Sequence, residues 1–296
     1  MTDDDARPVP DALELTQLPT LQGARMVMGF SGWMDGGDVS TGTVAHLIRS
    51  LDARPFGRIA PDDFYLYGVP GPMEVAAMFR PHVKITDGLI VDYRPPASTF
   101  YVCEDASLVL FTGREPNMRW EQYARCVLAV ADQLNVEMIY FVGSVSGLVP
   151  HTREPRLYCS LSDADFKPTM EQLGMRFTSY EGPSSLVTYL LRECGHRGTP
   201  MVTLVAEIPA YIQGINPHCI ESVVRRLAAM LNLDMPMDDL RQARDIFDEK
   251  LSKVLADKDE LPELIAKLES DYDSEVFDTQ MGDLKQWLTE RGVRPD

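Results

Sequence analysis

The residues best placed to do chemistry form a glycine-rich loop between an apolar run and an amphipathic run. The loop reads GFSGWMDGGD from Gly29 to Asp38. Its glycines permit positive φ angles and close backbone approach, and a helix beginning after it would offer free N–H groups to an anion. Three interpretations stay open: a structural loop that caps the helix, a ligand or partner site, or a site where Ser31 is a nucleophile. The candidate residues of this loop are Ser31, Trp33, Asp35, Gly36 and Gly37.

The loop departs from each sequence motif that it partly resembles. A phosphate-binding P-loop needs Gly-Lys-Ser/Thr, but Gly37 is followed by the acidic Asp38. The G-x-G-x-x-G spacing of a dinucleotide site is absent. A nucleophile elbow needs G-x-S-x-G, and Trp33 stands where its last glycine belongs. No named motif therefore assigns a reaction to this loop.

A second polar cluster, GSVSGLVPHTR, follows a later apolar run and ends in His151 and Arg153. His151 could serve as a general base near pH 7, or it could be a turn residue bonded to the backbone. Arg153 could clamp a carboxylate or a phosphate. No two histidines have the spacing of metal ligands, so we expect neither a metal site nor a cofactor.

Two more positions place charged residues at the ends of apolar runs. Arg114 and Glu115 could bind a ligand or pair with each other on the surface. Glu207 ends the run VTLVAE, where a carboxylate is costly unless it is hydrogen-bonded or functional. Glu207 could therefore belong to a pocket or to a structural contact.

These clusters must be positioned by the elements that precede them, which alternate in the manner of an α/β layer fold. Apolar runs predict core strands at 24–30, 107–112, 138–142 and 201–206, and amphipathic runs predict helices at 40–51, 119–134, 184–194 and 217–231. Asp38, Ser40 or Thr41 could cap the first helix. Residues 64–101 are strand-like but broken by prolines, which predicts edge strands or hairpins.

The helix at 119–134 connects two predicted strands and so predicts a β-α-β unit with parallel pairing. If strand 138–142 is also parallel to strand 24–30, the loops that follow them emerge at the same edge of the sheet. We therefore expect the loops at 29–38 and 143–153 to share a pocket.

The negative charge of the chain lies mostly at its two ends. The chain has 296 residues with 45 acidic and 28 basic side chains, a formal charge of −17. Residues 1–20 carry −4, residues 234–296 carry −9, and the part between them carries −4. We expect an acidic segment at 1–20, an α/β body at 21–235 and a helical tail at 236–296. Binding to nucleic acid or to anionic lipid is not expected of so acidic a chain.

The tail carries apolar stripes at helical spacing, which predict faces that pack on the body or on another subunit, or that capture another protein. The stripes contain Leu240, Ile246, Phe247, Leu251, Val254 and Leu255, then Leu264, Ile265 and Leu268, then a stretch from Ser274 to Trp287 and Leu288.

Several features predict a cytoplasmic protein. No apolar run is long enough to span a bilayer, and the start MTDDDARP lacks the pattern of a signal peptide. The five cysteines are scattered and contain no Cys-x-x-Cys pair, so we expect buried thiols rather than disulfides.

Across residues 20–235 the sequence resembles the actinobacterial branch of the proteasome assembly chaperone 2 family. The resemblance rests on segments at 29–37, 61–65, 113–116, 119–120, 150–153, 181–183, 209–211 and 216–217. It implies a mixed, largely parallel twisted sheet flanked by helices, similar to nucleoside phosphorylases and related hydrolases, with an acidic helical appendage. It also implies a non-catalytic assembly chaperone or scaffold that self-associates, with a trimer as one possible form. The chain ends Arg294-Pro295-Asp296 rather than in the hydrophobic-Tyr-x tail of such chaperones, so docking of that tail into a proteasome is not expected.

Three functions remain open from the sequence. The first is an assembly or scaffold protein that acts through protein contacts. The second is a small-molecule enzyme, such as a hydrolase or a phosphorylase-like enzyme with a nucleoside-type ligand. The third is a ligand-sensing regulator that uses the same pocket without turnover. Convergence of Ser31, Asp35, His151, Arg153 and Glu207 in one cleft would favour the second and third.

Overall fold

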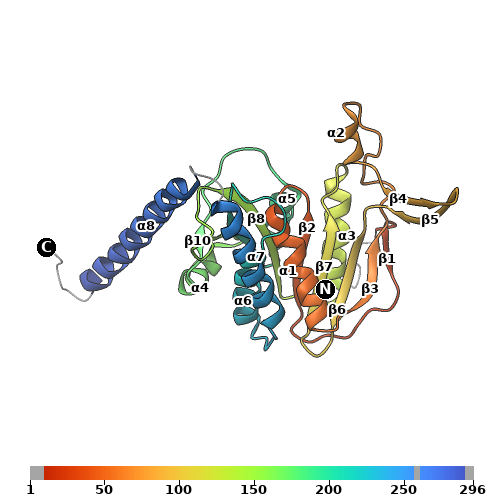
Figure 1. The fold of residues 1–296 in the computed structure, drawn as a ribbon. Helices are drawn as coiled ribbons and strands as arrows, with labels where there is room; N and C mark the ends of the chain where they lie inside the picture. Colours follow the sequence, from red (N-terminus) through yellow and green to blue (C-terminus); the bar gives the residue numbers. More distant parts are fainter. Residues whose placement is uncertain (1–9, 257–260, 291–296) are drawn as a thin grey trace, which may run out of the picture.

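A computed structural model describes residues 10–256 and 261–290 of the chain. Within these residues nine strands form one mixed sheet in the order β1-β3-β6-β7-β2-β8-β11-β9-β10. Figure 1 shows helices on both faces of this sheet, which confirms the predicted α/β class. The strands are β1 (Leu13–Leu15), β2 (Arg25–Ser31), β3 (Arg54–Ile59), β6 (Ser98–Cys103), β7 (Leu108–Arg114), β8 (Met138–Gly147), β9 (Leu157–Cys159), β10 (Arg176–Phe177) and β11 (Met201–Pro209).

The centre of the sheet is parallel and its flanks are mixed. Strands β7, β2, β8 and β11 run parallel to one another. Strands β1, β3 and β6 join one side in antiparallel pairs, and β9 joins β11 antiparallel on the other. All four core strands predicted from apolar runs are these central strands, because strands buried on both faces have nearly continuous apolar sequences.

The pairing inferred for the β-α-β unit is wrong in one respect. Strands β7 and β8, joined by α3 (Trp120–Gln133), are parallel but not neighbours, since β2 hydrogen-bonds to both of them. The crossover therefore passes over one strand. As a result β2, the strand before the glycine-rich loop, lies in the middle of the sheet beside β8.

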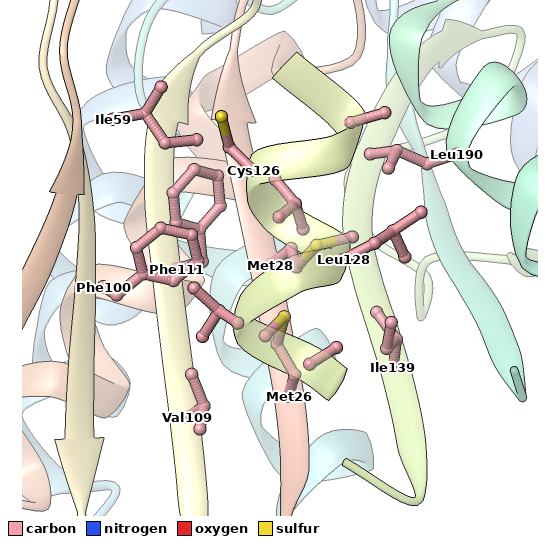
Figure 2. Packing of buried hydrophobic residues seen from close by; sticks show 14 of the residues in the cluster. Met26, Met28, Ile59, Phe100, Val109, Phe111, Cys126, Leu128, Ile139 and Leu190 are labelled. Carbon is pink, nitrogen blue, oxygen red and sulfur yellow. The ribbon is translucent and has the colours of Figure 1, made fainter. Parts of the chain in front are cut away.

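Four helices cover the two faces of the sheet. Helices α3 and α5 (Leu186–Arg197) pack on one face, and α1 (Val39–Ser50) and α6 (Pro217–Leu231) on the other. Figure 2 shows the first face, where Met26 and Met28 of β2 meet Cys126 and Leu128 of α3. Val27, between the two methionines, lies in the cluster under α1 and α6.

The helix boundaries follow from local capping. Ser185 Oγ accepts a hydrogen bond from Thr188 N at the start of α5, and Gly198 ends that helix with φ 69°. Asn216 Oδ1 caps α6, whose first residue is Pro217. Two short helical segments complete this half of the chain, a 3₁₀ turn at Ala164–Phe166 and α4 (Lys167–Gln172).

A separate two-stranded hairpin leaves the body between β3 and β6, as the proline-broken sequence at 64–101 predicts. It consists of β4 (His82–Thr86) and β5 (Leu89–Arg94) and follows the short helix α2 (Met73–Ala77). Asp87 and Gly88 both have positive φ at its turn, which suits the right-handed twist of the strands. Figure 1 shows α2 and the hairpin extending beyond the body, and we call residues 73–94 the arm.

Two helices form the end of the described chain. Helix α7 (Asp238–Ala256) packs on α6 and buries Leu240 against the core. Helix α8 (Leu261–Glu290) is one continuous helix and not two stretches, because Pro262 lies in its first turn, where proline is tolerated. Ile265 and Leu268 are buried, while Ile246, Val254 and Leu264 are exposed. The side chains of Leu255, Trp287 and Leu288 lie outside the described residues.

Strand β1 lies in the segment that the sequence analysis set apart as residues 1–20, and it hydrogen-bonds to β3. None of the helices described is both long and apolar enough to cross a membrane.

Candidate functional site

The glycine-rich loop and the histidine-containing loop share one edge of the sheet. Strands β2 and β8 are adjacent and parallel, and Asp35, four residues beyond the end of β2, forms an isolated bridge with Ser144 of β8. Ser144 N donates to Met34 O at 2.9 Å, and Ser144 Oγ donates to Gly36 O at 2.6 Å. The expectation of a common edge is confirmed. Because the loops hydrogen-bond directly to each other, however, no open space separates them at this point.

Asp35 caps the helix that follows the glycine-rich loop. Its two carboxylate oxygens accept hydrogen bonds from Thr41 N at 3.0 Å and from Thr41 Oγ1 at 2.7 Å. Of the predicted caps, Asp38 occupies the N-cap position but its side chain makes no capping bond, and Ser40 Oγ instead accepts from Phe30 N and donates to Val142 O. Burial raises the pKa of Asp35, and the bonds from Thr41 oppose that shift.

Packing accounts for two of the four glycines of the loop, Gly36 and Gly37. A Cβ atom on Gly36 would lie 2.7 Å from Ile208 Cδ1, and one on Gly37 would lie 2.8 Å from Asn216 Cβ. Gly37 also has φ 64° and accepts a hydrogen bond from Asn216 N at 2.8 Å. The loop thus packs against β11 and the start of α6, where a side chain at either position would force its neighbour to move.

Glu115 joins the glycine-rich loop to α5. Its Oε2 accepts a hydrogen bond from Trp33 N at 3.1 Å, and its Oε1 accepts one from Leu186 N at 2.9 Å. Its backbone N donates to Ser31 O at 2.9 Å. In the described part of the chain the Ser31 hydroxyl makes no hydrogen bond to a histidine or a carboxylate, so nothing there activates it as a nucleophile. Arg114 turns away and donates to Met78 O at the base of the arm.

His151 lies beside Tyr211 at a different corner of the edge. Tyr211 Oη is 2.8 Å from both His151 N and His151 Nδ1, so it accepts from the amide and its own O–H can donate to the ring. Burial lowers the pKa of His151, which agrees with a neutral ring. A cavity of about 10 Å³ beside it holds at most one water molecule. The residues around that cavity include His151, Arg153, Glu207 and His218.

Arg153 and Glu207 are held by ion pairs. Arg153 makes a bidentate contact with Asp273 of α8, at 2.8 Å from Nε and 2.7 Å from Nη2. Glu207 accepts from Arg156 Nη1 at 3.5 Å. The ligand predicted for Arg153 is therefore a carboxylate of the chain's own tail. Sequence reasoning missed Arg156, Tyr211 and Tyr272, because their partners are distant in the sequence.

A larger pocket lies on the α5 face of the sheet, between α5 and the strands β8, β11 and β9. Its volume is about 750 Å³, and Trp33 is the only candidate residue from the sequence that lines it. The candidates therefore do not converge. Trp33 lines this pocket, and His151, Arg153 and Glu207 surround the small cavity. The other six take part in hydrogen bonds or packing that fix the backbone; they are Ser31, Asp35, Gly36, Gly37, Arg114 and Glu115. Among the described residues no group of three or more His, Cys, Asp or Glu could hold a metal ion. Other residues lining the larger pocket are Met34, Val145, Val187, Leu191 and Val205.

Several solved structures with this fold come from actinobacteria. The proteasome-assembly chaperone homologue of Mycobacterium tuberculosis is 30% identical, with a TM-score of 0.71 over 81% of this chain and 99% of that one. A PAC2 family protein from Streptomyces avermitilis is 29% identical, with a TM-score of 0.69 over 82% and 99%. A Mycobacterium tuberculosis protein of unknown function, 21% identical, has a TM-score of 0.78 over 91% and 93%, and shares the fold.

No curated protein matches the sequence. The sequence profile of the PAC2 family matches residues 29–255. This range includes the glycine-rich loop, the loops that follow the parallel strands, and nearly all of α7. The chain therefore belongs to the PAC2 family.

Proposed function

We propose that this chain is a non-catalytic, assembly-chaperone-like protein that acts through contacts with other proteins and associates with copies of itself. The observation that carries the proposal is the arm, which presents apolar side chains to solvent. The name of the Mycobacterium relative, a proteasome-assembly chaperone homologue, indicates the same class of function. The dispersal of the candidate catalytic residues removes the support that convergence would have lent to the enzyme alternative.

One face of the hairpin of the arm is apolar, and the other face is mixed because Leu89 pairs with Thr86 there. Val83 pairs with Tyr93 and Ile85 pairs with Ile90, while Lys84 pairs with Asp92 on the other face. Ile85 is 60% exposed and Ile90 is 67% exposed. A two-stranded ribbon is at best marginally stable alone in water, and large exposed apolar patches mark interaction sites. The apolar face of the hairpin is therefore expected to pack against another protein surface.

The charge of the arm is compatible with contact between two copies of the chain. Residues 80–94 contain three basic and two acidic side chains, although the chain as a whole carries −17. Two acidic copies can meet at this nearly neutral hairpin without bringing their excess charge together.

All five cysteines are buried free thiols, which is typical of a protein in the reducing cytoplasm.

The test is a double variant, Ile85→Lys with Ile90→Glu, studied by sedimentation equilibrium of the full chain. The two new side chains face each other across the ribbon, so their ion pair helps the hairpin to fold while two exposed side chains of the apolar face are removed. The unmodified chain is expected to sediment as a multiple of 33.2 kDa. The variant is expected to associate at least tenfold more weakly.

Leu148→Lys with Ile215→Glu serves as the matched control, because it places the same charges on exposed apolar residues outside the arm. It should associate like the unmodified chain. Equal weakening by both variants, or an unmodified chain that is a monomer at tens of micromolar, would overturn self-association through the arm.

The chaperone role is tested with purified α and β proteasome subunits from the same organism. Ring assembly is followed by native electrophoresis with and without the chain. We expect the chain to change the rate of assembly and the arm variant to have a smaller effect. An unchanged rate would refute the chaperone role while leaving the self-association result intact.

A further inference from the structure

We propose that the 750 Å³ pocket beside α5 is a binding site for a small uncharged molecule with a flat apolar body and hydrogen-bonding oxygens. Its volume lies in the range of pockets that hold small ligands, roughly 300 to 1,000 Å³. It is separate from the cavity at His151, with which it shares no lining residue. The proposal does not depend on self-association or on the chaperone role.

The apolar part of the lining comes from both layers around the pocket. Val145 and Val205 extend from β8 and β11, and Val187 and Leu191 extend from α5. These side chains give an aromatic or aliphatic body an apolar contact on two sides. Burial of such a body contributes about 25 cal/mol for each Å² removed from water.

Hydroxyl groups supply the polar part of the lining. Thr203 Oγ1 accepts a hydrogen bond from Ser160 N at 2.9 Å, which leaves its own proton for an oxygen of the ligand. The Ser160 hydroxyl has no hydrogen-bond partner among the described residues. Tyr158 and Thr178 also line the pocket. These groups can donate to or accept from a neutral ligand.

The charges around the pocket disfavour an anion. None of the described lining residues carries a charge. Helix α5 begins at the pocket and its free N–H groups would attract an anion, but Glu115 already accepts from Leu186 N and Ser185 from Thr188 N. A second negative group would meet the Glu115 carboxylate without a cation among the lining residues to balance it.

Two aromatic side chains line the pocket and are largely exposed to solvent. Trp33 and Tyr180 both line it, and each is 66% exposed. A large exposed tryptophan is costly to leave in water, and its ring offers a flat stacking surface. Stacking of a flat ligand against Trp33 would cover this surface. The backbone of Trp33 is already fixed by Glu115, so the ring is held near the pocket.

The probe is N-phenyl-1-naphthylamine, an uncharged dye that fluoresces in apolar sites, titrated into the full-length protein. Its comparison is 8-anilino-1-naphthalenesulfonate, which has the same aromatic body and an added sulfonate. We expect saturable binding of one neutral dye per chain and at least tenfold weaker binding of the sulfonate. Energy transfer from Trp33 to the dye should be lost in Trp33→Phe.

Val145→Trp is designed to fill the pocket from a partly exposed strand position, and it should weaken binding of the neutral dye at least tenfold. Leu148→Trp adds the same ring to a surface position outside the lining and should leave binding unchanged. Thr188→Trp, on the exposed side of α5, repeats the test if the first variant does not fold.

Three results would overturn the site. They are equal binding of the neutral and charged dyes, unchanged binding in the pocket-filling variants, and loss of binding in the arm variant Ile85→Lys with Ile90→Glu. The last result would place the dye on the exposed hairpin instead of in the pocket.

Discussion

Glu115 illustrates how one side chain can fix the backbone at the edge of the sheet. It follows the last residue of β7, and its carboxylate bonds the amides of Trp33 and Leu186, which lie 82 and 71 residues away. Hydrogen bonds to charged groups contribute more than neutral ones. Glu115, which the sequence analysis expected either to bind a ligand or to pair with Arg114 on the surface, is thus a structural link between two layers.

Replacing Glu115 tests this role. We expect Glu115→Ala to lower the free energy of unfolding by about 2 kcal/mol, because two partly exposed bonds to a carboxylate are lost. Glu115→Gln keeps one acceptor oxygen and should lose about half as much. Urea denaturation measures both.

The matched control is Glu104→Ala, which removes an exposed ion pair with Arg54 and should cost at most about 0.5 kcal/mol. Similar losses for Glu104→Ala and Glu115→Ala would show that the two amide bonds do not stabilise the fold.

His46 makes the stability of the fold depend on pH. Its side chain is 1% exposed on α1, and burial lowers its pKa from 6.5, with nearby Arg49 adding to the shift and Asp239 opposing it. The unfolded chain therefore binds a proton at a higher pH than the folded chain does. Stability from this group is complete well above pH 6.5 and falls as the pH drops through 6.5 towards the folded pKa.

We accordingly expect His46→Gln to reduce the loss of unfolding free energy between pH 7.5 and pH 5.5, measured by urea denaturation at each pH. Part of the loss should remain, because burial also lowers the pKa of His151. An unchanged pH dependence in the variant would mean that folding does not shift the pKa of His46.

At the scale of elements, the sequence signal was strong for segments buried on both sides and weak at the edges. The runs ARMVMGF and MIYFV predicted the central strands because both faces are covered. Strand β3 was missed because Pro55 and Gly57 interrupt RPFGRI, and β1, β9 and β10 have three residues or fewer.

The common edge of the two loops could likewise be predicted from strand direction, but their contacts could not. Gly36 and Gly37 are required by Ile208 and Asn216, more than 170 residues further along the chain. Arg153 pairs with Asp273, 120 residues away. Such requirements arise from tertiary packing, which local pattern does not encode.

The first half of α8 is held to the body by a small set of side chains. Arg156 lies 4.5 Å from the centre of the Tyr272 ring, and Tyr272 Oη donates to Glu154 O at 2.8 Å. Arg153 and Arg176 pair with Asp273 and Glu275. Figure 1 shows the rest of α8 extending away from the sheet.

Tyr272→Ala should loosen this attachment. We expect amide hydrogen exchange in residues 261–277 to rise at least tenfold, since loss of the ring removes a cation–π contact and a hydrogen bond, about 1.4 kcal/mol in total. Exchange in β2 and β8 should not change. Phe277→Ala, at an exposed position on the same helix, is the control. Unchanged exchange in Tyr272→Ala would mean that the ion pairs and the buried Ile265 and Leu268 hold the helix without the Tyr272 ring.

At the scale of the whole molecule, the apolar arm lies apart from the most acidic segment of the chain. Eighteen acidic side chains lie in residues 234–296, the segment that contains α7 and α8. The arm and α8 project from opposite ends of the body in Figure 1. This separation lets an acidic protein keep an apolar contact surface in a part of the chain with little net charge.

The separation predicts how salt should affect self-association through the arm. Each copy carries −17, so two copies repel each other at low ionic strength, whereas the contact itself is apolar. Raising NaCl from 50 to 500 mM shortens the screening length to a few ångströms and weakens that repulsion while leaving apolar burial intact. We expect the dissociation constant from sedimentation equilibrium to fall severalfold. A rise with salt would show that ion pairs, and not the apolar face of the hairpin, hold the copies together.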